Sequence, residues 1–287
     1  MIVRGLLIVV LLGVQGVVCD HGNNAMSNEI PHVNHGGVKM GVKDIKCDDG
    51  IHNLTVDWDG SADAYTCETD MWSPLEQDIQ WKQSAVCEPV KPPLHRCLTT
   101  PIEYDEVLPT SGKHRPLWPK FGEYRYLPTQ RWLHNLEHGC AVFLYHPCAP
   151  QSEVDELRRI ATRCLRKHII TPYNKLPRDL PFAVVTYGCK LQIPYVNETA
   201  VVNFVKDHAL QAPEADYPRN GDFSVELITP SLIVSDRMDS ELCPLNPAML
   251  PDFEPSTVAP DVVVKGQHAR KKHKRMKEIA ELEFNEI

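Results

Sequence analysis

Two histidines and a glutamate in the segment HNLEHG, residues 134–139, have the types and spacing of a metal-binding motif. Side chains three and four positions apart are neighbours on a helix, so His134, Glu137 and His138 would share one face. Histidines one turn apart can bind zinc, and the glutamate can act as base, as in the H-x-x-E-H pattern of inverted zinc proteases. The motif therefore offers a candidate metal site at His134 and His138, with zinc as the candidate cofactor and Glu137 as the candidate catalytic residue, beside a structural interpretation that the sequence favours.

A third ligand would have to come from elsewhere in the chain. His114, in the preceding loop, is the first candidate, and Glu153 or Asp155 is the carboxylate alternative. A strand-like segment follows the motif at once, which places the histidines at the frayed end of a short helix. Two metal-free interpretations therefore stay open. Either Glu137 fixes the loop by bonding His114 or backbone amides near Ser111, or the site performs acid–base catalysis without a metal.

The hydrophobic pattern predicts the elements that position the motif. Thr129 is expected to cap a short helix over residues 130–138, with Gly139 just past its end. A buried strand over residues 140–147, an amphipathic helix over 152–169, a second strand over 181–189 and a second helix over 198–210 follow. This order predicts one compact strand-helix-strand-helix core of the α/β class, with α+β as the alternative and a parallel strand pair through a crossover.

Three arginines crowd the same segment, at positions 115, 125 and 131. They could bind an anion, but arginine serves more often in ion pairs. We expect them to pair with nearby acidic side chains, namely Glu123, Glu103 or Asp105.

The N-terminus and the cysteines indicate the secretory pathway. Residues 1–19 have a charged start, an apolar run and small residues before Cys19, which is typical of a cleaved signal peptide. Nine cysteines follow, so disulfides are expected, with one thiol left free and buried or paired to another chain. Asn53 and Asn197 lie in N-glycosylation sequons. We therefore expect a secreted or lumenal, disulfide-bonded glycoprotein.

Composition divides the rest of the chain. Residues 20–43 are read as a flexible leader and 44–100 as a cysteine-rich annex stapled by disulfides. The core spans residues 101–216, a less ordered extension 217–243, a proline-rich linker 244–264, and a basic-then-acidic helical tail 265–287.

Several function classes are disfavoured. The net charge of −8 argues against nucleic-acid binding, and no second apolar stretch is long enough to be a transmembrane helix of the mature chain. The sequence has no C-x-x-C pair, phosphate-binding loop or dinucleotide fingerprint. Redox and nucleotide-dependent enzymes are therefore poor candidates.

The string LPTSGKHRPLWPKFGEYRYLPTQRWLHNLEHGCAVFLYHPC, residues 108–148, resembles the tumour protein p53-inducible protein 13 family, which shares a domain of unknown function with many bacterial proteins. The likeness covers about residues 97–214. It rests on Pro109, Thr110, Ser111, Gly112, His114, Leu136, Glu137, His138, Gly139, Tyr145 and Pro147.

This resemblance implies an extracytoplasmic α/β domain and, for animal members, restrained cell growth. It implies no reaction, cofactor or catalytic residue. Animal relatives are expected to carry a membrane-spanning segment after the domain, whereas this sequence shows none. We therefore expect a non-enzymatic, growth-regulatory, tumour-suppressor-like glycoprotein with an unknown protein partner. The alternative is a zinc-dependent hydrolase that uses His134, Glu137 and His138.

Overall fold

The structure, a computed structural model, describes residues 35–74 and 84–252 of the 287-residue chain. The predicted signal peptide, residues 20–34 of the predicted leader, the linker beyond residue 252 and the helical tail lie outside the described residues. No described helix has both the length and the apolar character needed to cross a membrane.

A mixed seven-stranded sheet forms the centre of the described chain, with the order β1-β6-β5-β3-β4-β2-β7. The helices are α1 (Thr129–Glu137), α2 (Gln151–Cys164), α3 (Glu198–His208) and the short 3₁₀ turns η1 (Leu54–Val56) and η2 (Ala62–Ala64). The sheet strands are β1 (Ser84–Cys87), β2 (Gly122–Tyr124), β3 (Ala141–Tyr145), β4 (His168–Pro172), β5 (Phe182–Thr186), β6 (Cys189–Ile193) and β7 (Leu227–Pro230), and β8 (Leu232–Ile233) pairs with β9 (Leu250–Pro251). Strand β4 is parallel to β3 and β2, and the other pairs are antiparallel. The α/β class is confirmed. The strands predicted at residues 140–147 and 181–189 pair antiparallel, as β3 and β5. The parallel crossover runs instead from β3 through α2 to β4, and the helix predicted over residues 152–169 was too long, because the chain leaves the helix after Cys164 and enters β4 at His168.

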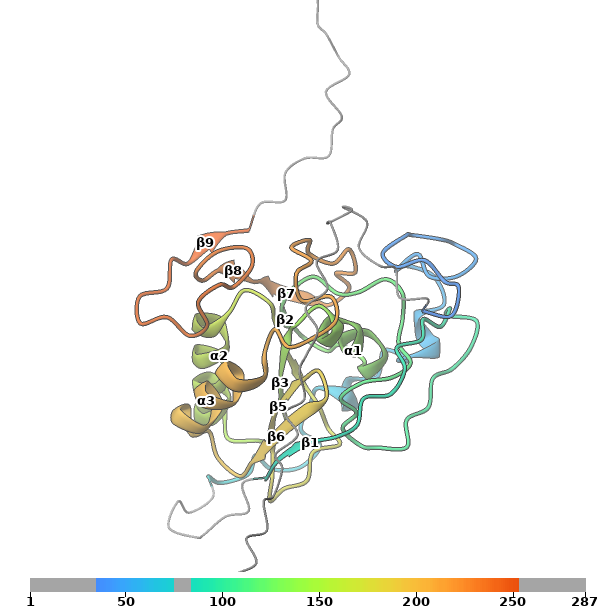
Figure 1. The fold of residues 1–287 in the computed structure, drawn as a ribbon. Coiled ribbons are helices and arrows are strands. Elements are labelled where there is room, and N and C mark those ends of the chain that lie inside the picture. The colour runs from blue at the N-terminus through green and yellow to red at the C-terminus, as the bar shows by residue number, and fades with distance from the viewer. Residues whose placement is uncertain (1–34, 75–83, 253–287) are drawn as a thin grey trace, which may run out of the picture.

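The two faces of the sheet carry separate hydrophobic cores because side chains alternate along each strand. Phe143 of β3 packs with the α2 and α3 side, whereas Val142 and Leu144 pack with the α1 side. Figure 1 shows α1 on one side of the sheet and α2 and α3 on the other. Glu153 and Asp155 belong to α2, so the sheet separates them from α1 and neither can complete a site with His134 and His138.

Helix α1 differs from its prediction at the first residue. Pro128 takes the N-cap position in extended conformation, and Thr129 is already helical and makes no side-chain cap bond. The C-terminal end agrees with the prediction: Gly139 has φ +79°, in the left-handed region that favours glycine. A Cβ at this position would lie 2.9 Å from Leu210 Cα, so close packing also requires glycine.

Four disulfides join the described chain, and two of them tie the annex to the core. The pairs are Cys47–Cys97, Cys67–Cys148, Cys87–Cys189 and Cys164–Cys243. Cys140 is free and buried within the described residues, which corresponds to the first of the two predicted fates of the odd cysteine.

Two buried arginines of the core form ion pairs with aspartates of the annex. Arg115 pairs with Asp57, and Arg131 pairs with Asp48, with N–O distances of 2.5 and 2.6 Å. Arg125 pairs with Glu226 at 3.4 Å. The prediction of ion pairs was therefore right, but the expected partners were wrong. The annex brings Asp57 and Asp48 to the two buried arginines, and the exposed Arg125 pairs with Glu226 of the predicted extension.

Both ends of the described chain pack more closely than their composition suggests. His35, within the predicted leader, is only 8% exposed. Asp252, within the predicted linker, pairs with buried Arg166 at 2.6 Å, and Cys243 is bonded to α2. These contacts join residues 79 or more positions apart along the chain, which local composition does not reveal.

Candidate metal centre

Helix α1 turns both histidines of the HNLEHG motif inward. His134 and His138 have no exposed surface, and their rings stack with centroids 5.1 Å apart. His134 Nδ1 donates to the Arg115 carbonyl oxygen at 2.6 Å. Its Nε2, which then carries the lone pair, faces inward.

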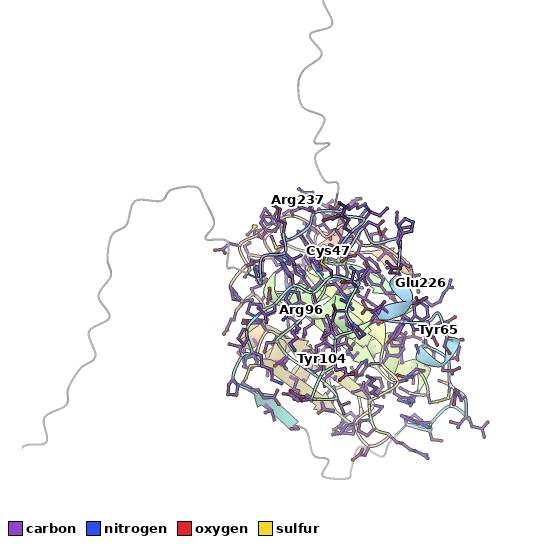
Figure 2. All side chains as sticks on the ribbon, turned by 90° about the vertical axis from the view of Figure 1, so that its right-hand side faces the viewer. Cys47, Tyr65, Arg96, Tyr104, Glu226 and Arg237 are labelled. Carbon is purple, nitrogen blue, oxygen red and sulfur yellow. A yellow bond between two sulfur atoms is a disulfide. The ribbon has the colours of Figure 1, made fainter. Side chains whose placement is uncertain are left out.

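Two backbone segments bring further histidines to this face. His114 N donates to the Leu94 carbonyl and Arg96 N donates to the His114 carbonyl, so residues 94–96 run beside His114. His95 thereby stacks on His134, with ring centroids 4.9 Å apart. Arg96 and Cys47, neighbours of these segments, lie on the side of the molecule that Figure 2 turns to the viewer.

Two more residues, one early and one late in the described chain, complete the group. His35 stacks on His95 with ring centroids 4.3 Å apart, and its Nε2 lies 3.1 Å from Glu214 Oε1. The Glu214 amide donates to the Glu137 carbonyl, which fixes this loop against the end of α1. We call the resulting group the histidine–glutamate cluster: His35, His95, His114, His134, His138, Glu137 and Glu214.

The cluster contains many buried polar atoms without a hydrogen-bond partner in the described chain. They are Nε2 of His95, His114 and His134, both ring nitrogens of His138, both carboxylate oxygens of Glu137, and Glu214 Oε2. Each such atom costs about 1–3 kcal/mol if nothing satisfies it. A cation bound among them would satisfy several at once.

The protonated ring nitrogens have the arrangement that metal-binding histidines use. His95 Nδ1 donates to the Val38 carbonyl at 2.9 Å, and His114 Nδ1 donates to the Gly112 carbonyl at 2.8 Å. A carbonyl can only accept, so the proton sits on Nδ1 and Nε2 keeps its lone pair. Such a bond from the other ring nitrogen orients a metal-binding imidazole and fixes its tautomer.

Burial keeps the imidazoles neutral. It lowers the pKa of His95 and His138 to about 4 and that of His114 and His134 well below the ordinary value. Burial, followed by the charge of Glu214, raises the pKa of Glu137 to about 9. Neutral imidazoles are the form that binds a metal, and a divalent cation would restore the ionised form of Glu137.

Two ligand groups have atoms that all lie within 4.8 Å of one another: His35, His95 and His114, and His35, Glu137 and Glu214. The predicted trio of His114, His134 and His138 is not such a group among the described residues; only His114 belongs to one. A third group, which contains Cys87 and Cys189, is not a metal site because these cysteines form a disulfide.

The predicted structural role of Glu137 has weak support in the geometry. Its Oε2 lies 3.6 Å from His114 Nε2, beyond hydrogen-bonding distance. Ser111 instead accepts from the Lys91 amide. Contacts from Glu137 to the loop therefore leave its carboxylate unsatisfied within the described chain.

Sequence reasoning missed three members of the cluster, His35, His95 and Glu214. His35 was assigned to a leader, and neither His95 nor Glu214 belongs to a spaced motif. Only their contacts in the folded chain identify them, since they lie far from α1 in the sequence.

The remaining residues on which the family resemblance rests lie outside the cluster. Pro109, Thr110, Ser111 and Gly112 are buried in the loop before His114, and Leu136 packs in the core beside α1. Tyr145 ends β3 and Pro147 follows it, at the opposite end of the strand from Gly139.

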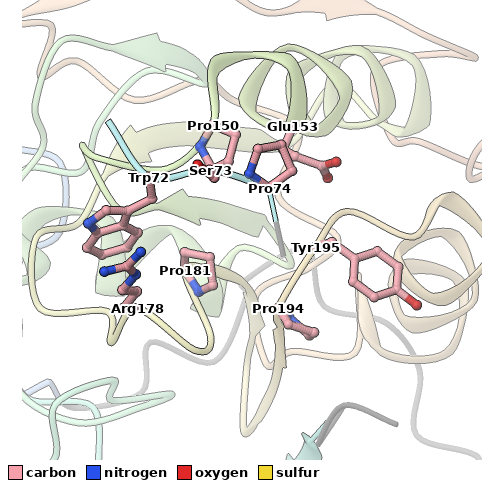
Figure 3. A pocket seen from close by; sticks show the side chains of 9 residues that line it. All are labelled: Trp72, Ser73, Pro74, Pro150, Glu153, Arg178, Pro181, Pro194 and Tyr195. Atoms are coloured by element: carbon pink, nitrogen blue, oxygen red, sulfur yellow. The ribbon is translucent and has the colours of Figure 1, made fainter. Parts of the chain in front are cut away.

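Two hollows lie near these elements, and neither is lined by the cluster side chains. One of about 260 Å³ is lined by Leu94, Gly112 and Lys113, sequence neighbours of His95 and His114. The other lies among Trp72, Arg178 and four prolines, one of which, Pro150, precedes α2 (Figure 3), and has only about 10 Å³, the space of one water molecule. Six of the seven cluster residues are buried within the described chain, and Glu214 is partly exposed.

Comparison with known proteins gives one match. Residues 95–221 match the family described as "Protein of unknown function (DUF3105)". This segment contains six of the seven cluster residues, whereas His35 lies before it. No curated protein and no solved structure matches the chain. The chain is thus similar to a family of unknown function over the core domain.

Proposed function

We propose that this domain binds a divalent transition-metal ion in a closed centre built from the histidine–glutamate cluster. The observation that carries the proposal is the set of buried lone pairs on Nε2 of His95, His114 and His134, which face inward with no donor among the described residues. A metal ion supplies the partner that these atoms need.

The donor set defines the class of ion. Imidazole nitrogen and carboxylate oxygen suit zinc and the neighbouring divalent first-row metals. The two carboxylates of Glu137 and Glu214 would neutralise a divalent charge in this buried place, which limits the cost of bringing the ion into the interior. Zinc is the candidate we select.

The enclosure favours a structural or storage centre over the hydrolase alternative. A catalytic zinc keeps an open position for water or substrate. Here His114, His134 and His138 are wholly buried and Glu137 is 2% exposed. We therefore infer a non-enzymatic metal-binding protein, in which Glu137 serves as a ligand or charge partner and not as a base.

The proposed setting is the secretory pathway. Four disulfides are consistent with an oxidising compartment. Asn53 and Asn197 are both exposed, as a glycan requires, and Asn197 uses only its Oδ1 to cap α3 through the Ala200 amide. Two glycans on the secreted protein, each lost in the matching Asn→Gln variant, would support this setting.

A role in restraining cell growth, through an unknown protein partner, completes the proposal and is supported by the resemblance to the p53-inducible protein 13 family. The test is overexpression of the wild-type chain beside His95→Ala/His114→Ala in cultured animal cells. Slower growth with the wild type alone would link growth to the metal centre. Unchanged growth with both would refute the growth role and leave metal binding to stand.

The direct test of metal binding is equilibrium dialysis of the folded protein against zinc, with zinc measured by mass spectrometry. We expect about one zinc per chain for the wild type and little for His95→Ala/His114→Ala. Circular dichroism of both proteins would separate loss of the site from loss of the fold. A folded wild type that takes up no zinc, cobalt or copper would refute the proposal.

A further inference from the structure

Residues 35–41, which we call the lid segment, lie directly over the histidine–glutamate cluster. His95 donates its amide to the His35 carbonyl and its Nδ1 to the Val38 carbonyl, both at 2.9 Å. Gly41 donates its amide to the Pro116 carbonyl at 2.9 Å. The lid segment therefore covers the outer side of His95 and ends beside Trp118, whose ring packs against His134 and His138.

His35 is the one residue of the lid segment that is buried. Gly36, Gly37 and Lys39 are exposed, whereas His35 is buried beneath them. Three glycines with φ between +63° and +82° allow the tight path that places the His35 ring inside. Beyond residue 43 the chain is fastened independently, by the Cys47–Cys97 disulfide and the Asp48–Arg131 ion pair.

His35 connects the lid segment to the histidine and the glutamate parts of the cluster. It is the one residue shared by both groups of close ligand atoms. It stacks on His95, and its Nε2 lies 3.1 Å from Glu214. It also lies outside residues 95–221, the segment that matches the family of unknown function.

We propose that the lid segment supplies His35 as a metal ligand and that its opening controls how fast the ion enters and leaves. This inference rests on the proposed metal-binding function and adds its regulation. An ion held by His95, His114 and a carboxylate would gain a further nitrogen only when the lid segment is closed. Removing the ion would take away one of the contacts that hold the segment closed, beside its hydrogen bonds to His95 and Pro116.

The first test changes the ligand. His35→Ala should still bind zinc, through the remaining cluster residues, but with a dissociation constant raised at least about tenfold. The matched control is His52→Ala, because His52 is exposed and lies beyond the fastened point of the chain. Equal zinc affinities for His35→Ala and wild type would refute His35 as a ligand.

The second test uses a substitution that should prevent the lid segment from closing and that changes none of the proposed ligands. A Cβ at Gly41 would meet Trp118 Cζ3, whereas a Cβ at Gly37, at a similar positive φ, has no atom within 4 Å. Gly41→Ala should therefore release zinc to a chelator several-fold faster than Gly37→Ala. The Gly37→Ala variant has similar backbone strain but no steric overlap. Equal release rates for these two variants would refute control by the lid segment.

Hydrogen exchange provides a readout that does not depend on variants. Chelation of the wild-type protein should increase amide exchange in the peptide covering residues 35–43 and leave α2, across the sheet, unchanged. If the protein binds zinc but the amides of this peptide exchange equally fast with and without zinc, the proposed lid is refuted and the proposed metal binding is not. If the wild type binds no metal, the proposed function itself fails.

Discussion

A buried histidine can hold a metal or can simply fill a core position, and this protein allows the proposed metal-binding histidines to be compared with another buried histidine. His168 on β4 is 2% exposed and donates Nδ1 to the Leu165 carbonyl at 2.6 Å, as the cluster histidines do to other carbonyls. It belongs to none of the close ligand groups in the described chain. A hydrogen bond from Nδ1 to a carbonyl is therefore not sufficient to identify a metal site. The cluster differs from His168 because several of its Nε2 atoms lack a hydrogen-bond partner among the described residues and lie close together.

This contrast gives a prediction about single residues. His114→Ala should abolish stoichiometric zinc binding, because His114 lies in the nitrogen group with His35 and His95. His168→Ala removes an equally buried imidazole on another element and should retain full binding. Zinc titration of both proteins, with a fluorescent competitor, measures the difference. Equal zinc loss in the two variants would mean that binding follows overall stability and not the cluster.

A second residue-scale prediction concerns Asp239, away from the cluster. Burial raises its pKa to about 6, although it accepts hydrogen bonds from the Arg166 and Lys167 amides. Between its ordinary value of 3.8 and about 6, the folded protein holds a proton here that the unfolded chain has lost. Stability from this group is therefore present below pH 4 and is lost as the pH rises, by about 3 kcal/mol in total.

Asp239→Asn, which cannot titrate, should remove this component of the pH dependence. Urea unfolding of wild type and variant between pH 4 and 7 measures it as the difference of the two curves. Asp236→Asn is the control with opposite sign, because hydrogen bonds from Ser240, which outweigh burial, lower the pKa of exposed Asp236. A constant difference between wild type and Asp239→Asn across this range would contradict the prediction.

At the scale of elements, the junction from α1 to β3 determines where the cluster stands. Gly139 turns the chain so that α1 packs on one face of the sheet while β3 enters its centre. The predicted helix, glycine and buried strand were recognisable because each leaves a local mark: a periodicity of 3.6, a residue tolerant of positive φ, and a run of apolar residues.

Gly139→Ala should destabilise the fold by about 2–4 kcal/mol, since it combines positive-φ strain with overlap against Leu210. Gly60→Ala, at φ +88° with no atom within 4 Å of the added Cβ, should cost only the strain, about 1 kcal/mol. Denaturant midpoints of the two variants test this. A cost for Gly139→Ala no larger than for Gly60→Ala would show that the junction can relax.

The elements outside the core were harder to predict from the sequence. The edge strands β1 and β7, and β2 beside β7, have three or four residues each and no strong period, so only pairing with their neighbours defines them. His95 and His35 occupy irregular segments whose positions are set by a bridge to His114 and by the lid segment. The α1 half of the candidate site was thus predictable, whereas the half that arrives from distant loops was not.

At the scale of the whole molecule, the disulfides differ in what they hold. Cys47–Cys97 lies two residues from His95, and Leu98 donates its amide to the Cys47 carbonyl. Cys67–Cys148 fastens the annex at the opposite end of β3, where Trp72 stacks on His146. One end of the annex therefore contributes to the candidate site, whereas the other end is bonded to the core away from that site.

Replacing Cys47 and Cys97 by serine should lower both stability and zinc affinity, whereas replacing Cys67 and Cys148 should lower stability alone. Each loss of stability is expected to be about 2–5 kcal/mol. Calorimetric unfolding together with zinc titration of the two double variants separates the effects. Equal zinc affinity in both would show that the annex does not support the centre.

Metal binding by the histidine–glutamate cluster can be observed in a crystal structure of the zinc-soaked, secreted protein, with anomalous scattering measured at the zinc edge. We predict one strong anomalous peak inside the cluster, within about 2.0–2.2 Å of nitrogen or oxygen atoms of His95, His114 and at least one other member. A well-ordered structure with no anomalous peak in the cluster, or with zinc bound only at the protein surface, would contradict the account.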